Sequence, residues 1–421
     1  MENTIYWIWL SMACRPSGTT FGKLIKEFNG AKEIYEAESK KISSIIGYKN
    51  SDRSALENKD LENATKVFEF CKKHNVGVLL YSDEKYPDAL RKIENPPVLL
   101  YYRGILPEFN KRFFVAAVGT RSLSDYGRKH TFKISFDLAS VGAIIVSGMA
   151  IGIDGVAMAG ALSSGGSCVA VIGSGIDVCY PPQHLQLARE IVKNGCVLTE
   201  YAPGTRPSRF NFPSRNRIIS GLSSATIVFE GPEKSGALIT ARCATEQGRR
   251  VYTLPAPIGH KNGELSSLLI KNGAKICTRA EDVINDFTDK FSSTLNPFLL
   301  KERVSIDMMS ALRKYSVCAV CPGDDIFNPP RTFAKKFTET ENKEPLGVQL
   351  EDKREPVLPP NGFDKESLKV YKKIPLNSPC TIESLVSDQM NLREVIKHLL
   401  KLEVSGFVVL LPGEMVSRKF K

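Results

Sequence analysis

The chain has 421 residues, 42% of them hydrophobic, with 57 Lys and Arg against 46 Asp and Glu, a formal net charge of +11. This length predicts two to four domains, and the basic balance favours an anionic partner without identifying it. The roughly 18 consecutive apolar residues of a membrane span are absent, and the 10 cysteines are scattered, which is typical of reduced thiols in a cytoplasmic protein and excludes a disulfide framework.

Residues 1–80 have the pattern of a helical domain. Four stretches (TTFGKLIKEF, AKEIYEAE, KISSIIG and LENATKVFEFCKKH) carry apolar residues at helical spacing, as at Leu24, Ile25 and Phe28. The preceding IYWIWLSMAC looks like the apolar part of a lipoprotein signal. It has Glu2 and no Lys or Arg before it, so we interpret it as the first helix of the domain.

Residues 81–110 form a connecting segment in which prolines interrupt helix and the final VLLYY predicts a strand. From 111 to 287 strands and helices alternate. The strand candidates are FFVAAVG (113–119), AIIVSG (143–148), CVAVIG (168–173), CVLTE (196–200), ATIVFE (225–230), RVYTLP (250–255) and AKICT (274–278). Such continuous apolar runs predict a doubly wound parallel sheet between helix layers, with a ligand site at its carboxyl edge.

The pattern changes again after residue 287. Residues 288–364 are rich in Pro, Lys, Glu, Asp and Asn, which predicts a flexible linker. Cys318 and Cys321 form a lone CxxC pair there, weak evidence for a metal site. Residues 365–421 predict three helices and a hairpin, the composition of a small winged-helix module.

SGMAIGID, residues 147–154, follows an apolar strand and precedes a small-residue helix. Its G-x-x-x-G-x-x-G spacing is not the dinucleotide fingerprint, and the nearest approach to a P-loop, GTTFGKL at 18–24, is one residue short. Glycines and a helix N-terminus still suit a phosphate. Asp154 fits either an N-cap of that helix or a ligand contact.

Residues 201–229 contain Arg206, Arg209, Arg215 and Arg217, with Phe210 and Phe212 between them and no acidic residue before Glu230. Arginines that neutralise phosphates beside aromatic rings that stack on bases are what a groove for single-stranded nucleic acid requires. The alternative is structural: Arg215 and Arg217 brace neighbouring loops, and either Phe ring, taken singly, belongs to the core.

An enzymatic function finds little support in the sequence. The 5 histidines have no metal-ligand spacing, and the carboxylates at strand ends, such as Asp177 and Glu200, form no paired constellation for acid–base chemistry. We therefore predict that the protein is not an enzyme and needs neither cofactor nor metal.

Several motifs in order, GTR (119–121), SGMAIGID, GSGIDVCYP (173–181), FPSRNRIISGLS (212–223) and SGALITARCATEQGRRV (235–251), resemble the DprA/Smf DNA-processing family. The resemblance implies an extended Rossmann-like fold, with a SAM-like helical domain before it and a winged helix after it. It also implies a cytoplasmic homodimer, paired through the Rossmann-like domain, that binds single-stranded DNA without cutting it. Such a protein protects incoming DNA in natural transformation and loads the RecA recombinase.

The resemblance also implies which residues contact DNA. Arg121 and Arg209 would contact phosphates, Phe212 would stack on a base, and Arg249 would add a further basic contact. The full predicted set is Gly119, Thr120, Arg121, Ser147, Gly148, Gly152, Arg209, Phe212, Arg215, Asn216, Arg217, Ser235, Gly236 and Arg249. Two departures from the family pattern are Pro182 and His184 after Tyr180-Pro181, and Pro255-Ala256 in place of Pro-Gly.

Two alternatives remain open at the level of sequence. A phosphoribohydrolase-like enzyme could use a related sheet, but its PGGxGTxxE signature is absent and EGPEKSGALIT (230–240) stands in the corresponding turn. A sequence-specific regulator led by the winged helix is disfavoured, because residues 365–421 hold few arginines and their charge is mixed.

Overall fold

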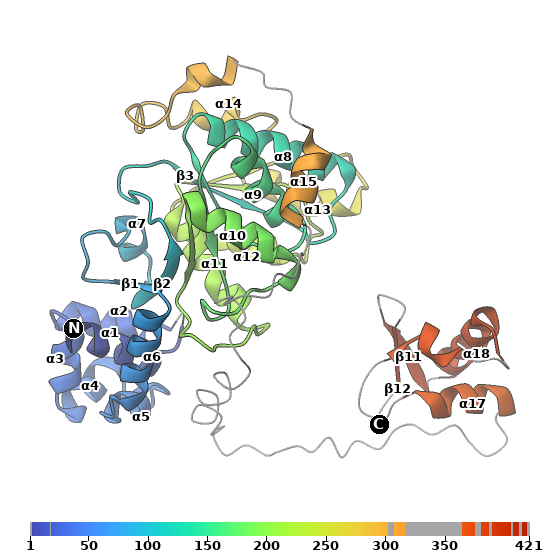
Figure 1. The fold of residues 1–421 in the computed structure, drawn as a ribbon, viewed down its shortest axis with the longest axis horizontal. Helices are drawn as coiled ribbons and strands as arrows, with labels where there is room; N and C mark the ends of the chain where they lie inside the picture. The colour runs from blue at the N-terminus through green and yellow to red at the C-terminus, as the bar shows by residue number, and fades with distance from the viewer. Residues whose placement is uncertain are drawn as a thin grey trace. The chain divides into compact units, whose positions relative to one another are not determined.

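The structure, a computed structural model, describes residues 2–16, 18–301, 307–316, 364–374, 380–386, 390–405, 407–411 and 415–418. These residues belong to two compact units (Figure 1). The larger unit contains the described residues up to 316, and the smaller unit contains those from 364 onward.

The N-terminal helices, blue in Figure 1, pack around the apolar first helix. Helix α1 (Glu2–Ala13) buries Trp7, Ile8 and Leu10 and lies against α3 and α6. The other helices of this group are α2 (Thr20–Glu27), α3 (Ala31–Glu36), α4 (Ser39–Ile46), α5 (Arg53–Glu57) and α6 (Glu62–Lys73). The interpretation of IYWIWLSMAC as a core helix is confirmed, while a SAM-like relationship stays a prediction.

A nine-stranded sheet of order β1-β2-β6-β5-β4-β3-β7-β8-β9 forms the centre of the larger unit. The strands are β1 (Gly77–Leu80), β2 (Leu99–Gly104), β3 (Phe114–Val118), β4 (Ile144–Ser147), β5 (Cys168–Val171), β6 (Cys196–Thr199), β7 (Ala225–Val228), β8 (Arg250–Thr253) and β9 (Lys275–Ile276). Strands β3 to β9 pair in parallel, and β1 and β2 extend the sheet antiparallel beside β6. All seven strands predicted in the central region are present, so the predicted α/β class with a mostly parallel sheet is confirmed.

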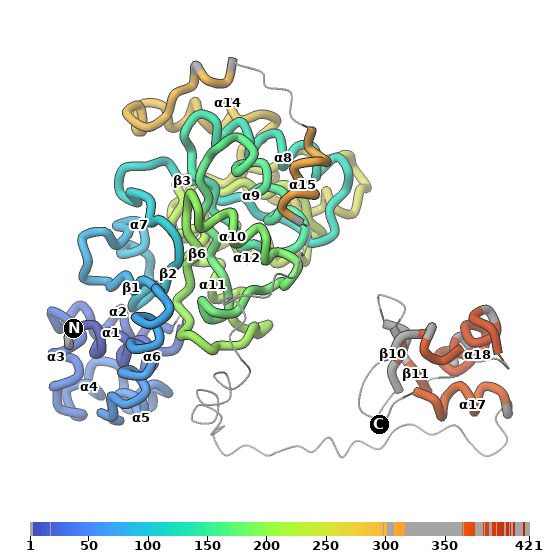
Figure 2. Tube along the Cα trace, in the orientation of Figure 1, coloured from blue at the N-terminus to red at the C-terminus, as the bar shows by residue number. Residues whose placement is uncertain are grey.

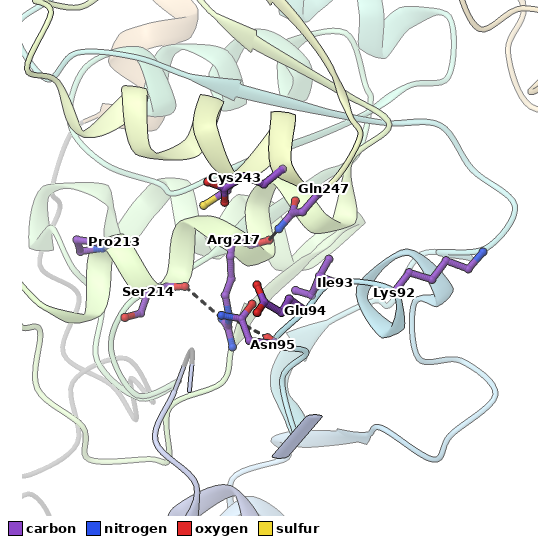
Figure 3. A pocket seen from close by; sticks show the side chains of 10 residues that line it. Lys92, Ile93, Glu94, Asn95, Pro213, Ser214, Arg217, Cys243 and Gln247 are labelled. Atoms are coloured by element: carbon purple, nitrogen blue, oxygen red, sulfur yellow. Dashed lines mark hydrogen bonds between the residues drawn. The ribbon is translucent and has the colours of Figure 1, made fainter. Parts of the chain in front are cut away.

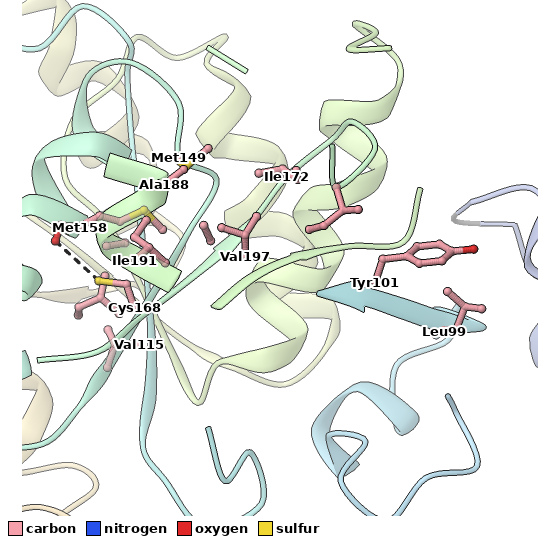
Figure 4. Packing of buried hydrophobic residues seen from close by; sticks show 14 of the residues in the cluster. Leu99, Tyr101, Val115, Met149, Met158, Cys168, Ile172, Ala188, Ile191 and Val197 are labelled. Carbon is pink, nitrogen blue, oxygen red and sulfur yellow. Dashed lines mark hydrogen bonds between the residues drawn. The ribbon is translucent and has the colours of Figure 1, made fainter. Parts of the chain in front are cut away.

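The sheet is buried on both faces. Successive residues of β3 belong to two different cores, Val115 and Ala117 to one, Phe114 and Ala116 to the other. Helices α8 (Asp125–Ser140), α9 (Ile153–Ser163) and α10 (Leu185–Asn194) pack on the first core, and α11 (Asn211–Leu222), α12 (Gly236–Glu246) and α13 (Glu264–Lys271) pack on the second. Figure 4 shows part of the first core, where the Cys168 thiol lies 3.7 Å from the carbonyl oxygen of Met158. Two-sided burial is why the strands have continuous apolar sequences.

Strand β3 marks the topological switch point of the sheet. It lies between β4 and β7, so the chain leaves β3 toward one side of the sheet and leaves β7 toward the other. Figure 2 traces the chain of this unit, with β3, β6, α11 and α12 labelled. In open α/β sheets the crevice at the carboxyl ends of such strands is where ligands bind.

The larger unit extends beyond the predicted boundary at residue 287. Phe291, Leu295 and Tyr315 are buried in its first core, in a stretch that includes η3 (Pro297–Lys301) and α15 (Met308–Ser316) after α14 (Glu281–Ile284). The predicted linker start at 288 is therefore wrong. The polar composition of the segment suggested a linker, but its few, widely spaced apolar residues pack into the core. Residues 317–363 of that predicted linker, with the CxxC pair, lie outside the described residues.

The smaller unit has its own core, made mainly by Val370, Tyr371, Val395, Leu399 and Leu402. Its elements are α17 (Lys365–Lys373), β10 (Cys380–Thr381), η4 (Glu383–Leu385), α18 (Leu392–Val404), β11 (Val408–Leu411) and β12 (Met415–Arg418), with strand order β10-β12-β11. A capping box of Asn391 and Glu394 begins α18. The predicted hairpin is β11–β12, and the winged-helix assignment stays a prediction.

Candidate nucleic-acid interface

The GTR turn after β3 is held by backbone contacts at the switch point. The Thr120 amide donates to the carbonyl oxygen of Glu230 at 2.7 Å, and the Ile153 amide donates to the carbonyl oxygen of Thr120 at 3.1 Å. The Glu230 carboxylate is buried and accepts from the Ser124 amide at 3.0 Å, at the N-terminus of α8. These bonds leave the Arg121 side chain exposed at the carboxyl edge.

The SGMAIGID turn is organised by Asp154 from within. The buried Asp154 carboxylate accepts from the amides of Gly148 at 3.1 Å and Ala150 at 3.4 Å. Burial raises the pKa of Asp154 above its ordinary value, an effect that nearby Arg215 opposes. The N-cap of α9 is Gly152, whose φ is +92°. Asp154 is therefore neither the N-cap nor a side chain presented to a ligand, because it holds the turn together.

Arg215 lies beneath the same turn. Its guanidinium donates to the carbonyl oxygen of Gly148 at 3.0 Å and to that of Val171, and the residue is 5% exposed. Burial lowers the pKa of the Arg215 guanidinium to about 10, so it is a cation at neutral pH. A side chain at Gly148 would meet this guanidinium, which explains the glycine. The buried guanidinium of Arg215 thus places a positive charge directly beneath the SGMAIGID turn.

A small hollow opens above this guanidinium, and its lining includes Arg121, Ile151, Tyr180, Phe212 and Arg215. The rings of Tyr180 and Phe212 stack with centroids 5.5 Å apart and 28° between their planes. The Arg121 guanidinium lies 5.8 Å from the centroid of the Phe212 ring. Tyr180 is 39% exposed, so one ring of the stacked pair faces solvent at the carboxyl edge.

A second arginine–aromatic pair precedes α11. The Arg209 guanidinium lies 4.9 Å from the centroid of the Phe210 ring, and Phe210 is 69% exposed. The structural alternative therefore fails for Phe210, which is not a core residue. Arg206 is exposed in the same segment.

Other predicted contacts are used inside the fold. Arg217 is buried and forms a two-pronged ion pair with Glu200 at 2.7 and 2.8 Å. The Ser147 hydroxyl donates to the carbonyl oxygen of Ala117 at 2.6 Å. Arg249 donates to the carbonyl oxygens of Ala89 and Gly221. Arg215 and Arg217, the two buried arginines of α11, therefore brace neighbouring segments, as the structural alternative predicted. The side chains of Ser147, Arg217 and Arg249 are bonded within the fold and are not presented to a ligand.

The N-terminus of α12 lies next to α11. Ser235 is the N-cap, and its hydroxyl accepts from the Ala237 amide at 3.2 Å. The half-buried Asn216 side chain donates to the carbonyl oxygen of Gly236 at 3.5 Å, and Gly236 has open space around its Cα. These three predicted residues therefore do lie together.

Known proteins resemble this chain over most of its length. Residues 77–288 match the family model of DNA recombination-mediator protein A. Protein Smf of Synechocystis sp. is 31% identical over 98% of both chains. The chain belongs to the DprA/Smf family. The DNA processing protein DprA of Streptococcus pneumoniae is 37% identical over 65% of this chain and 95% of its own. The X-ray structure of DprA from the same species has a TM-score of 0.60 and 33% identity, covering 67% of this chain and 98% of that chain. The family resemblance predicted from the motifs is confirmed.

Two residues that line the hollow of this DprA/Smf protein are not in the predicted set. Tyr180 follows β5 in the Tyr-Pro pair, and its place at the same sheet edge as Arg121 was the available signal. Ile151, 45% exposed within SGMAIGID, carries no sequence signal of its own.

The described residues of the DprA/Smf protein contain neither a metal-binding cluster nor a membrane span. In this part of the chain, no group of three or more His, Cys, Asp or Glu side chains could hold a metal ion. Among the described helices, none is long and apolar enough to cross a membrane.

Proposed function

We propose that this DprA/Smf protein binds single-stranded DNA at the carboxyl edge of its parallel sheet. The observation that carries the proposal is the group formed by Arg121, Phe212 and Tyr180, a guanidinium beside two stacked rings at an exposed edge. A guanidinium neutralises phosphate, and an exposed ring stacks on any base, so the combination suits a single strand without sequence preference. Duplex DNA keeps its bases stacked on one another and cannot use such rings.

In this proposal the exposed side chains make the direct contacts. Arg121 and Arg209 contact phosphates, while Tyr180, Phe212 and Phe210 offer their rings to bases. Each base that stacks on an aromatic ring contributes about 1–3 kcal/mol.

Backbone and buried groups complete the proposed site. Gly119, Thr120, Gly148 and Gly152 belong to the two turns that carry the proposed site, and the three glycines let these turns pack closely against each other and against Arg215. Asn216, Ser235 and Gly236 offer polar groups at the N-terminus of α12, where the helix dipole favours a phosphate. Arg215 acts from beneath, by holding the SGMAIGID turn and adding positive charge to it.

The wider role we propose is that of a non-catalytic mediator in the cytoplasm. Its family name, DNA recombination-mediator protein A, supports a role in recombination. The protein would cover incoming single strands during natural transformation and present them to the RecA recombinase as a homodimer paired through its Rossmann-like domain. The carboxylates of Asp154, Asp177 and Glu230 at this edge are each buried and hydrogen-bonded to the backbone, which supports the non-catalytic role.

Oligonucleotide binding tests the proposal. We would measure the affinity of the full chain for oligo-dT and for a duplex of equal length at several salt concentrations. The expected result is tighter binding of the single strand, with an affinity that falls as salt rises. Equal or tighter binding of the duplex would remove the proposed function.

A further inference from the structure

A second cavity, of about 460 Å³, opens in the larger unit (Figure 3). It lies between the segment 92–95, the first half of α11 and the end of α12. Figure 3 shows Arg217 in its floor, between Ser214 and Asn95. A cavity of this volume is in the range that accepts a small organic group.

The first turn of α11 separates this cavity from the hollow described above. Phe212 lines the hollow, while its neighbours Pro213 and Ser214 line the cavity. Because a helix with its side chains is about 10–12 Å wide, the two openings lie within one helix width of each other. A strand whose base stacks at Phe212 therefore passes close to the cavity.

The charged groups of the cavity do not suit a phosphate. Arg217 is neutralised by its ion pair with Glu200 and also donates to the carbonyl oxygen of Asn95 at 3.0 Å. The exposed carboxylates of Glu94 and Glu246 form no ion pair with a described residue. Lys92 also lines the cavity and offsets one of these two carboxylates, so the lining does not attract a phosphate, while its carboxylates accept hydrogen bonds from donor groups.

The remaining polar groups that line the cavity also suit a ligand that forms hydrogen bonds. Gln247 is held by a bond from its amide nitrogen to the carbonyl oxygen of Arg217 at 3.0 Å. Cys243 lines the same wall one helical turn before it. Burial, with a smaller effect of Glu246, raises the pKa of the Cys243 thiol, so the wall presents a neutral thiol and not a reactive thiolate.

We propose that this cavity is a second subsite for the same single strand and receives one nucleobase, with a preference for bases that carry an exocyclic amino group. The proposal rests on the proposed function, because it requires a strand in the hollow. Carboxylates accept hydrogen bonds from the amino group of cytosine, and side-chain amides pair with adenine, whereas thymine has no exocyclic amino group to offer. Bases of single strands can be turned outward and bound by their edges in this way.

The test compares homopolymers on the full chain. We would measure the affinities of the wild type for oligo-dC, oligo-dA and oligo-dT of equal length at one salt concentration. Phosphates are common to all three, but stacking strength differs between the bases, so the cavity variants are needed to assign a preference to the base edge. We expect oligo-dC and oligo-dA to bind about fivefold tighter than oligo-dT, the lower end of what one base contact provides.

Variants then assign the preference to the cavity. In the Glu94→Gln, Glu246→Gln double variant the ratio of oligo-dC to oligo-dT affinity should fall to about twofold or less. Cys243→Phe, which fills the cavity, should do the same while oligo-dT affinity is retained. Glu69→Gln, at an exposed carboxylate of α6 far from either site in sequence, is the matched control and should leave the ratio unchanged.

Each outcome decides between the two proposals. If the wild type binds oligo-dT but shows no preference, or if the preference survives in both cavity variants, the base subsite is wrong and the proposed function stands. If the wild type binds none of the three oligonucleotides, the proposed function itself is wrong. Retained oligo-dT affinity in the double variant shows that it is folded, so its ratio is informative whatever happens to Cys243→Phe.

Discussion

The carbonyl oxygen of Thr120 accepts a hydrogen bond of 3.1 Å from the amide of Ile153, and this bond joins the GTR turn to the SGMAIGID turn. The two turns follow neighbouring parallel strands, β3 and β4, so they meet at one edge of the sheet. Close approach of the backbones requires that the residue before Ile153 has no side chain. Gly152 meets this requirement, with a φ of +92°.

Gly152→Ala should therefore destabilise the protein by more than backbone strain alone. The added Cβ would collide with the carbonyl oxygens of Thr120 and Arg121, and neither can move without breaking the turn. Left-handed backbone costs an alanine about 1–2 kcal/mol, and overpacking adds about 1–3 kcal/mol. Gly165→Ala is the matched control, because Gly165 has a φ of +77° and no atom near its missing side chain. Urea unfolding that gives equal losses for the two variants would contradict the close approach.

Arg121→Gln and Arg209→Gln should each weaken binding to oligo-dT and flatten its salt dependence. One lost phosphate contact on a single strand lowers the slope of log affinity against log salt by about 0.7. Lys72→Gln, at an exposed cation of α6, removes the same charge away from the interface and should leave the slope as it is. A folded Arg121 variant with unchanged affinity and slope would take Arg121 out of the site.

Tyr180→Ala and Phe212→Ala should weaken oligo-dT binding in a different way. Stacking releases few counterions, so each variant should lose about 1–3 kcal/mol of binding free energy with little change in salt slope. Tyr48→Ala, at a tyrosine that is 64% exposed on the N-terminal helices, is the control for loss of an exposed ring. Full affinity in both hollow variants would show that the stacked rings do not contact bases.

His184 should make the protein less stable in acid. Its Nδ1 lies 2.9 Å from the carbonyl oxygen of Met149, and burial lowers the pKa of the imidazole below its ordinary value of 6.5. The unfolded chain thus binds a proton near pH 6.5 that the folded chain binds only at lower pH, so the free energy of unfolding falls as the pH drops below about 6.5. His184→Gln should remove part of this slope in urea unfolding between pH 7 and 5. The exposed His260→Gln should not, and equal slopes in all three proteins would argue against the buried imidazole.

The sequence predicts the sheet well because strands that are buried on both faces have continuous apolar sequences, which can be recognised directly. It also singles out Arg121 and Arg209, whose side chains are exposed and which stay predicted DNA contacts. The sequence cannot tell that Arg209 is exposed whereas Arg217 is buried, because the burial of Arg217 depends on its ion pair with Glu200, which is distant in the chain. Tyr180 is absent from the predicted set for a related reason, since its stacking on Phe212 joins the segment after β5 to the first turn of α11, which is distant in the chain.

The boundary after residue 287 is open to a direct test by truncation. A chain of residues 1–287 lacks Phe291 and Leu295, which are 9% and 5% exposed in the first core, and also Tyr315 of α15. Burial of each large apolar side chain contributes about 1.5–3 kcal/mol, so residues 1–316 should exceed residues 1–287 in free energy of unfolding by at least about 3 kcal/mol. The Phe291→Ala, Leu295→Ala double variant of residues 1–316 should reproduce most of that loss in urea unfolding. Oligo-dT affinity should be similar for residues 1–316 and the full chain, because the proposed contacts all precede residue 250. Equal stability of the two truncated chains would mean that the segment from 288 to 316 does not pack on the sheet in solution.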